Sequence, residues 1–133
     1  MTQPGPILVI DDDPDDRDAL RTVLEKAGVE PILTLSSAQE VFTYLRGVER
    51  SEDLPDLIIT DLNMPGINGY ELLQKLRTIN RYQHIPVVVC STSTFSADVS
   101  RCLAAGAKQY ISKPDTFEGF DYITHQVKHY VLN

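Results

Sequence analysis

The segment Leu57-Ile58-Ile59-Thr60-Asp61-Leu62-Asn63-Met64-Pro65-Gly66 joins an apolar run to a carboxylate and a set of turn-forming residues. A short, continuous apolar run is typical of a strand that is buried on both faces. The run Ile7-Leu8-Val9-Ile10 ends in the same way, in Asp11-Asp12. Two strands are therefore predicted to bring carboxylates to one edge of a sheet, where like charges do not gather without a cation.

Strand-length apolar runs alternate with segments of helical periodicity along the whole chain. The strands are expected at residues 7–10, 32–35, 57–60, 87–90 and 109–111. Five such units are too few for an eight-stranded barrel, so an open sheet remains. The predicted fold class is α/β, a doubly wound, five-stranded parallel sheet with helices on both faces. The flavodoxin-like strand order 2-1-3-4-5 places a ligand crevice between strands 1 and 3.

Capping signals mark where the intervening helices begin. The predicted caps are Asp13 before Pro14, Ser37 with Glu40, Ser96, and Asp115 with Glu118. The third helix is expected over residues 69–77. In the fourth, Val99, Cys102 and Leu103 are expected to face inward.

The composition excludes several classes of function. The chain has 133 residues and a formal net charge of -7, which argues against binding to nucleic acid or to an anionic membrane. Cys90 and Cys102 lie in apolar patterns and are expected to be buried free thiols, which fits a reducing cytoplasm. We find no basic leader and no apolar run long enough for a membrane span. Residues 1–133 are therefore expected to form a single, cytoplasmic domain.

The predicted crevice collects an unusual set of groups. Asp11, Asp12 and Asp61 follow strands 1 and 3, and Ser91 and Lys113 follow strands 4 and 5. Carboxylates with a turn carbonyl suit Mg²⁺, which keeps several waters and accepts phosphate oxygens. Phosphoryl chemistry follows, with one carboxylate as the nucleophile and an ammonium that neutralises the transferring group.

Asp61 is the better candidate for the nucleophile, because it starts a turn and is therefore expected to be exposed at the crevice. Asp11 and Asp12 lie together at one strand end, where they can share the metal. The acids of the following segment, Asp15, Asp16 and Asp18, are interpreted as solvated first-turn residues that the helix dipole favours, and are not assigned to the metal.

These residues and their spacing resemble the CheY-like receiver domains of two-component signalling. The matching features are Asp11-Asp12, Asp61 within the segment 61–69, Ser91 thirty positions later, and Lys113-Pro114 twenty-two after that. The resemblance covers essentially the whole chain. It implies a stand-alone response regulator in a phosphorelay, which is not a turnover enzyme and catalyses only its own phosphorylation and dephosphorylation.

The resemblance also implies a role for each residue of the site. Asp61 would be the phosphoacceptor. Asp12 and Asp61 would ligate Mg²⁺ with the backbone carbonyl of Asn63, and Asp11 would act through a bound water. Lys113 would pair with the phosphoryl group.

Further expectations concern the switch. Ser91 would move to hydrogen-bond a phosphoryl oxygen, and Tyr110 would swing into the space that Ser91 leaves. The Lys113-Pro114 bond is usually cis in the family, which would turn Lys113 towards the crevice. Thr92 is bulkier than the residue that many members carry, so we expect it to narrow the access of water to the acyl phosphate.

The partners implied are a sensor histidine kinase or a histidine phosphotransfer protein. The output would leave through the face formed by helix 4, strand 5 and helix 5, to a downstream target or to a second copy of the chain. The loop 47–56, the segment 85–93 and the lack of a tail also resemble regulators that partner phytochrome-type kinases.

Two alternatives from other classes remain open. One is a receiver-like adaptor that binds partners without phosphorylation. The other is a small Mg-dependent aspartyl phosphatase, which normally needs a second acid two residues after the nucleophile, where this chain has Asn63.

Overall fold

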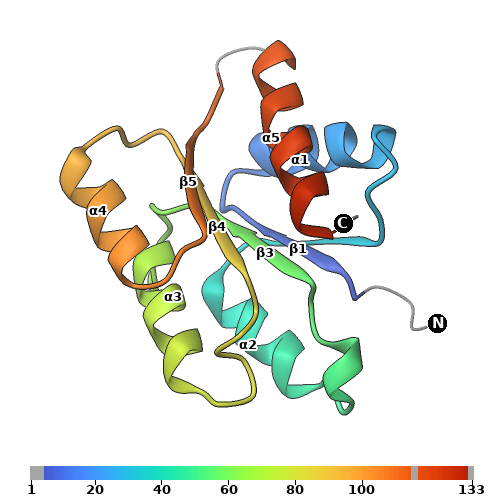
Figure 1. The fold of residues 1–133 in the computed structure, drawn as a ribbon, viewed down its shortest axis with the longest axis vertical. Helices are drawn as coiled ribbons and strands as arrows, with labels where there is room; N and C mark the ends of the chain where they lie inside the picture. The colour runs from blue at the N-terminus through green and yellow to red at the C-terminus, as the bar shows by residue number, and fades with distance from the viewer. Residues whose placement is uncertain (1–4, 115–116, 132–133) are drawn as a thin grey trace.

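The computed structural model describes residues 5–114 and 117–131, and it shows an α/β fold in which strands and helices alternate (Figure 1). The elements are β1 (Ile7–Ile10), α1 (Pro14–Lys26), β2 (Ile32–Leu35), α2 (Ala38–Arg46), the 3-10 turn η1 (Ser51–Asp53), β3 (Leu57–Thr60), α3 (Gly69–Thr78), β4 (Val87–Ser91), α4 (Ser96–Ala104), β5 (Gln109–Ser112) and α5 (Phe117–Val131). The predicted strands are confirmed to within one residue at their ends.

The five strands form one parallel sheet in the order β2-β1-β3-β4-β5. This is the predicted flavodoxin-like order. Ile10 pairs with Thr60, so β1 and β3 end at the same level and the residues that follow them share one edge of the sheet. Ser91 pairs with Ser112 in the same way at the ends of β4 and β5.

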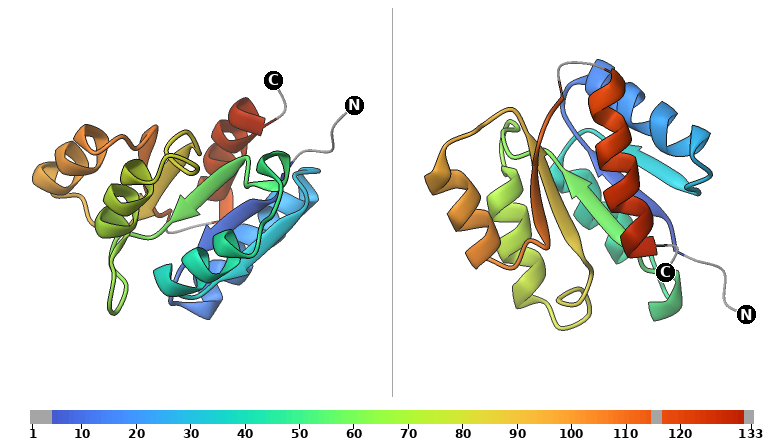
Figure 2. Two further views of the ribbon diagram at one scale, coloured as in Figure 1. Left: turned by 90° about the horizontal axis from the view of Figure 1, so that it is seen from below. Right: turned by 45° about the horizontal axis from the view of Figure 1, so that its top comes forward.

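Alternation along the central strands divides the core into two layers. On β1, Leu8 and Ile10 pack with α2, α3 and α4, whereas Ile7 and Val9 pack with α1 and α5. Figure 2 shows these two groups of helices on opposite faces of the sheet. All four residues are at most 2% exposed, which explains why this strand reads as an unbroken apolar run.

Two of the predicted caps are present. Asp13 accepts hydrogen bonds from the backbone N–H groups of Asp15 and Asp16, and Pro14 occupies the first position of α1. Ser37 accepts from the N–H of Glu40 at 3.2 Å. The return bond of this second box differs from the prediction, because Glu40 accepts from the backbone and the hydroxyl of Ser36 instead of from Ser37.

The prediction for the start of α4 was wrong. Phe95 is the cap residue and makes no side-chain capping bond, and Ser96 is already inside the helix. The prediction that Leu103 faces inward was also wrong, because Leu103 is 45% exposed while its neighbour Cys102 is fully buried. α4 therefore buries a narrower face than its apolar pattern suggests.

Some expectations concern the last helix and the membrane. Asp115 and the side chain of Glu118, the predicted cap of α5, lie outside the described residues. Cys90 and Cys102 are buried free thiols, as predicted. Over the described part of the chain, we find no helix with the length and apolar character needed to cross a membrane.

Candidate functional site

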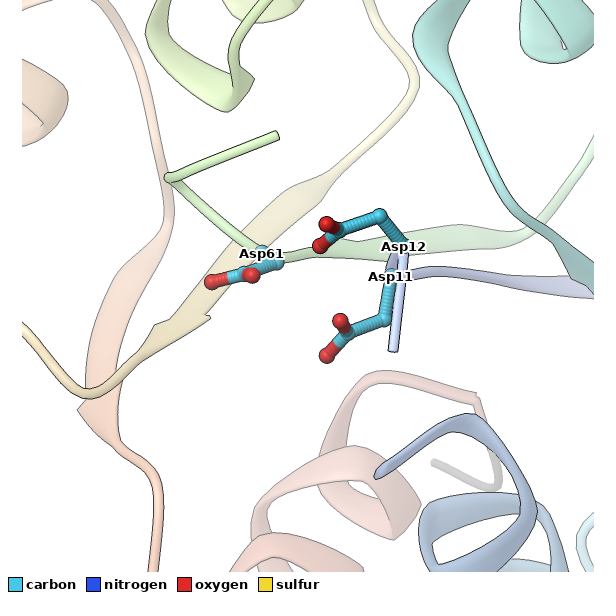
Figure 3. Close-up of side chains that lie close together, drawn as sticks. All are labelled: Asp11, Asp12 and Asp61. Atoms are coloured by element: carbon cyan, nitrogen blue, oxygen red, sulfur yellow. The ribbon is translucent and has the colours of Figure 1, made fainter. Parts of the chain in front are cut away.

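Three carboxylates meet where β1 and β3 end (Figure 3). Asp11, Asp12 and Asp61 each place one oxygen within 4.8 Å of the others. Asp11 and Asp61 are only 6% and 7% exposed, whereas Asp12 is exposed to solvent. The expectation that Asp61 is exposed was therefore wrong. The predicted convergence of these residues is therefore confirmed by the geometry.

Backbone hydrogen bonds fix the positions of the two buried carboxylates. The N–H of Asp61 donates to the carbonyl of Ile10 at 2.9 Å, which continues the ladder one step past the strands. The N–H of Leu62 donates to Asp61 Oδ1 at 2.8 Å and orients that carboxylate. Gly69 packs so closely beneath this turn that a Cβ there would collide with the carbonyl oxygen of Asp61.

The ammonium of Lys113 lies among the acids of the crevice. Its Nζ is 2.7 Å from Asp11 Oδ2 and 3.4 Å from Asp61 Oδ2. The backbone N–H of Lys113 donates to the carbonyl of Ser91 at 2.8 Å. The residue that follows β5 is therefore hydrogen-bonded to the last residue of β4. The sequence prediction that Lys113 reaches the crevice is confirmed.

The structure adds Asp16 and Arg17 to the residues predicted from the sequence. Asp16 Oδ2 lies 2.9 Å from Lys113 Nζ, so its interpretation as a solvated first-turn acid needs correction. Arg17 donates to the backbone carbonyl of Asp11 at 2.6 Å. Asp16 and Arg17 reach the site because α1 begins at the same edge of the sheet. The sequence does not show which face of the first turn of α1 points towards the site.

Burial is the main influence on the ionisation of the site. It raises the pKa of Asp11 and the pKa of Asp61, against the lowering effect of Lys113. Burial alone would lower the pKa of Lys113, but hydrogen bonds to Asp11 and Asp16 and the charge of Asp61 outweigh it and raise the pKa. Burial also raises the pKa of Cys90 to about 12, so this thiol at the crevice is protonated and a poor nucleophile.

The residues present fit a hard divalent cation. Carboxylate oxygens from Asp11, Asp12 and Asp61 lie close enough to share one ion. With Asp16, the described residues of the crevice include four carboxylates, against two cations: the Lys113 ammonium and the Arg17 guanidinium, which donates to the Asp11 carbonyl. Two of these carboxylates, Asp11 and Asp61, are buried. The remaining excess of negative charge at the crevice is unfavourable, and a dication at this position would offset it.

Ser91 and Tyr110 are linked through the loop after β4. Ser91 is fully buried, and its Oγ accepts a hydrogen bond from the N–H of Ser93 at 3.2 Å. The hydroxyl of Tyr110, which is half-buried, donates to the carbonyl of Ser93 at 2.9 Å. Ser93 also donates from its own hydroxyl to Asp98 Oδ2 at 2.6 Å, which connects the loop to α4.

The sequence left open whether the Lys113-Pro114 bond has the cis form that is usual in the family. Among the described residues, the cis peptide bond is at Glu30-Pro31, and the bond between Lys113 and Pro114 is trans. Lys113 nevertheless contacts Asp11 and Asp61.

The model of the response regulator receiver domain matches residues 7–123. The chain belongs to this family. Receiver domains are phosphorylation-controlled switches that act with histidine kinases or phosphotransfer proteins in two-component signalling, and they are not generally classed as enzymes.

Individual relatives agree with the receiver assignment. Response regulator Rre1 of Synechocystis is 33% identical over 86% of this chain, and chemotaxis protein CheY1 of Helicobacter pylori is 34% identical over 83%. The chain spans 86% of CheY1 but only 47% of Rre1, and about half of several other curated relatives.

Solved structures agree with the fold. The phosphorylated cyanobacterial phytochrome response regulator RcpA superposes with a TM-score of 0.85, at 26% identity, and the match covers 98% of this chain and 96% of RcpA. The chemotaxis regulator CheY4 of Vibrio cholerae gives a TM-score of 0.77 at 25% identity, over 94% of this chain and 99% of CheY4.

Proposed function

We propose that this receiver domain accepts a phosphoryl group on Asp61 and thereby switches its binding to other proteins. The observation that carries the proposal is the meeting of Asp61 with Asp11, Asp12 and the Lys113 ammonium at one edge of the sheet. A nucleophilic carboxylate beside a cation and a set of metal-binding acids is what phosphoryl transfer to an aspartate requires.

The reaction proceeds by in-line displacement at phosphorus. An oxygen of Asp61 forms the new P–O bond as the P–N bond of a phosphohistidine breaks, and the electron pair of that bond goes to the histidine nitrogen. Leu62 donates its N–H to Asp61 Oδ1, so Oδ2 is the better placed of the two oxygens to attack. Lys113, 3.4 Å from Asp61 Oδ2, balances the charge of the phosphoryl oxygens.

The metal site would be built from Asp12, Asp61 and the backbone carbonyl of Asn63, with Asp11 acting through a water. When bound, Mg²⁺ would supply charge neutralisation to the phosphoryl oxygens. The carboxylates have the mutual distances that such an ion needs. Asp12 is exposed and Asp61 is buried, so the proposed ligands differ in their access to solvent.

The switch would run from Ser91 to the α4-β5-α5 face. The Ser91 hydroxyl accepts a hydrogen bond from the N–H of Ser93, and the Tyr110 hydroxyl donates one to the carbonyl of Ser93. The backbone of Ser93 therefore connects the two switch side chains. If Ser91 turns to a phosphoryl oxygen, its bond to Ser93 is lost and Tyr110 is free to move inward. Driving such a change from 1:99 to 99:1 takes about 5.5 kcal/mol, which a doubly charged group in contact with a metal and an ammonium can supply.

The proposed input is a sensor histidine kinase or a phosphotransfer protein, and the proposed output is a protein target or a second copy of the chain. The similarity to RcpA, a phytochrome response regulator, supports a phytochrome-type kinase as the donor. The net charge of -7 disfavours nucleic acid as a direct target.

Labelled acetyl phosphate tests the proposal. The wild-type protein is expected to acquire label when incubated with Mg²⁺ and to acquire much less when incubated without it, and the Asp61→Asn variant is expected to remain unlabelled. Failure of the wild type to acquire label would favour the alternative of an adaptor that works without phosphorylation. Continued release of phosphate from a monoester substrate would instead favour the aspartyl phosphatase.

A further inference from the structure

The Lys113 ammonium is held more closely by two other acids than by Asp61. Its Nζ is 2.7 Å from Asp11 Oδ2 and 2.9 Å from Asp16 Oδ2, but 3.4 Å from Asp61 Oδ2. An ammonium carries three hydrogens. The two shorter contacts occupy two of them, and the third remains for an acceptor on the side of Asp61.

We propose that Asp16 is a positioning residue, which holds the Lys113 ammonium so that its third hydrogen faces a phosphoryl group on Asp61. The inference rests on the function proposed above. With Asp11 as the only firm anchor, the flexible lysine side chain could turn about a single bond or collapse onto Asp61 itself. A second anchor from α1, on the other wall of the crevice, prevents both movements.

The position of Asp16 on the helix distinguishes it from its neighbours. Asp15 and Asp18 belong to the same part of α1 and carry the same charge, but both are exposed. Among the described residues, the ion pairs of Lys113 are those with Asp11, Asp16 and Asp61. The helix therefore turns one acid of this group towards the site, and the other two offer matched controls.

The contact is better suited to orientation than to stability. The side chain of Asp16 is 41% exposed, whereas that of Lys113 is 14% exposed. An ion pair with a solvated partner adds little to folding stability. A fixed ammonium, in contrast, needs no reorganisation when the phosphoryl group arrives, and preorganised charge of this kind is effective in phosphoryl transfer.

Binding of beryllofluoride, which mimics a phosphoryl group on a carboxylate, tests the proposal in the presence of Mg²⁺. The chain has no Trp, so amide NMR signals are the suitable readout. We expect Asp16→Asn to weaken binding by about threefold to tenfold and Asp16→Glu to restore part of the loss. Asp15→Asn removes the same charge and is expected to bind as tightly as the wild type or more tightly, because repulsion of the anion falls. The midpoint temperatures of thermal unfolding of the Asp16 variants are expected to match that of the wild type, because an ion pair with a solvated partner adds little stability.

A double-mutant cycle shows whether Asp16 acts through Lys113. In a Lys113→Met background, Asp16→Asn should cause no further loss of affinity. The proposal is overturned if the wild type binds beryllofluoride and Asp16→Asn binds as well as Asp15→Asn, or if the loss persists without Lys113. A wild type that does not bind at all would instead refute the proposed function, and this inference with it.

Discussion

Arg77 connects three segments of the chain through its guanidinium. One nitrogen donates to the carbonyls of Gln83 and Ile85, at 3.0 and 3.1 Å, and the other donates to the carbonyl of Gly106 at 3.2 Å. These bonds join α3 to the loop before β4 and to the turn after α4. A lysine has a single ammonium on a flexible stem and cannot reproduce this fork.

Arg77→Lys is therefore expected to lower the free energy of unfolding by about 2 kcal/mol. Urea denaturation followed by circular dichroism measures the change. Arg81→Lys is the control: Arg81 is exposed, and its guanidinium lies 6.0 Å from the centre of the Tyr82 ring. A change of less than about 0.5 kcal/mol in Arg77→Lys would show that these bonds add nothing beyond those to water.

Thr92 is exposed and directly follows the buried Ser91 at the end of β4. We expect Thr92 to narrow the path of water to an acyl phosphate on Asp61. Thr92→Ala should then shorten the lifetime of the phosphorylated protein by about twofold to tenfold. The decay of label after removal of the donor measures this lifetime. An unchanged rate would mean that water reaches the phosphoryl group by another path.

The residues of the site differ in how far the sequence could predict them. Asp11, Asp61 and Lys113 were predictable because the ends of parallel strands share one edge, whatever the detailed packing. Asp16 was not, because Asp15, Asp16 and Asp18 are alike in sequence and only the rotation of α1 decides which of them meets Lys113.

At the scale of elements, the caps of α3 and α4 differ. Asn68 accepts from the N–H of Glu71 at 2.8 Å, and Glu71 accepts from the N–H of Asn68 at 3.1 Å, which completes a capping box. α4 begins after Phe95 without such a bond, and Ser96 caps nothing. The two helices therefore depend differently on their first polar residue.

Asn68→Ala is expected to lower the free energy of unfolding by about 1 kcal/mol, because it removes the side-chain acceptor of the Glu71 N–H in the first turn of α3. Ser96→Ala, at the start of α4, is the matched control and should change stability by less than about 0.5 kcal/mol. Chemical denaturation of both variants provides the comparison. Equal losses would contradict the difference between the two caps.

The element boundaries followed from periodicity, but the buried face of α4 did not. The pattern of Val99, Cys102 and Leu103 suggested a broad inward stripe, and the helix buries Cys102 while Leu103 is 45% exposed. Apolar residues at helical spacing predict that one face of the helix is buried, but the packing against neighbouring elements decides how wide that face is. Phe95, which is 75% exposed, adds to the apolar character of the outer surface of α4.

At the scale of the whole molecule, both core layers are attached to one sheet. β1 contributes alternate residues to the layer of α2, α3 and α4 and to the layer of α1 and α5. Neither layer can lose its packing without exposing the central strands. We therefore expect residues 1–133 to fold as one cooperative unit.

This expectation gives two measurable results. Chemical unfolding should follow a single transition by both tyrosine fluorescence and far-ultraviolet circular dichroism. Small-angle X-ray scattering of the monomer should give a radius of gyration of about 14 Å. Separate transitions for the two probes would mean that the two helical layers unfold independently.

The central claim is that Asp61 is the residue that receives the phosphoryl group. Borohydride reduces an aspartyl phosphate to homoserine, so reduction after treatment with acetyl phosphate and Mg²⁺, followed by peptide mass spectrometry, marks the modified residue directly. Homoserine at position 61 is the predicted result. Homoserine at Asp11 or Asp12, or at no position in a protein that has acquired label, would contradict it.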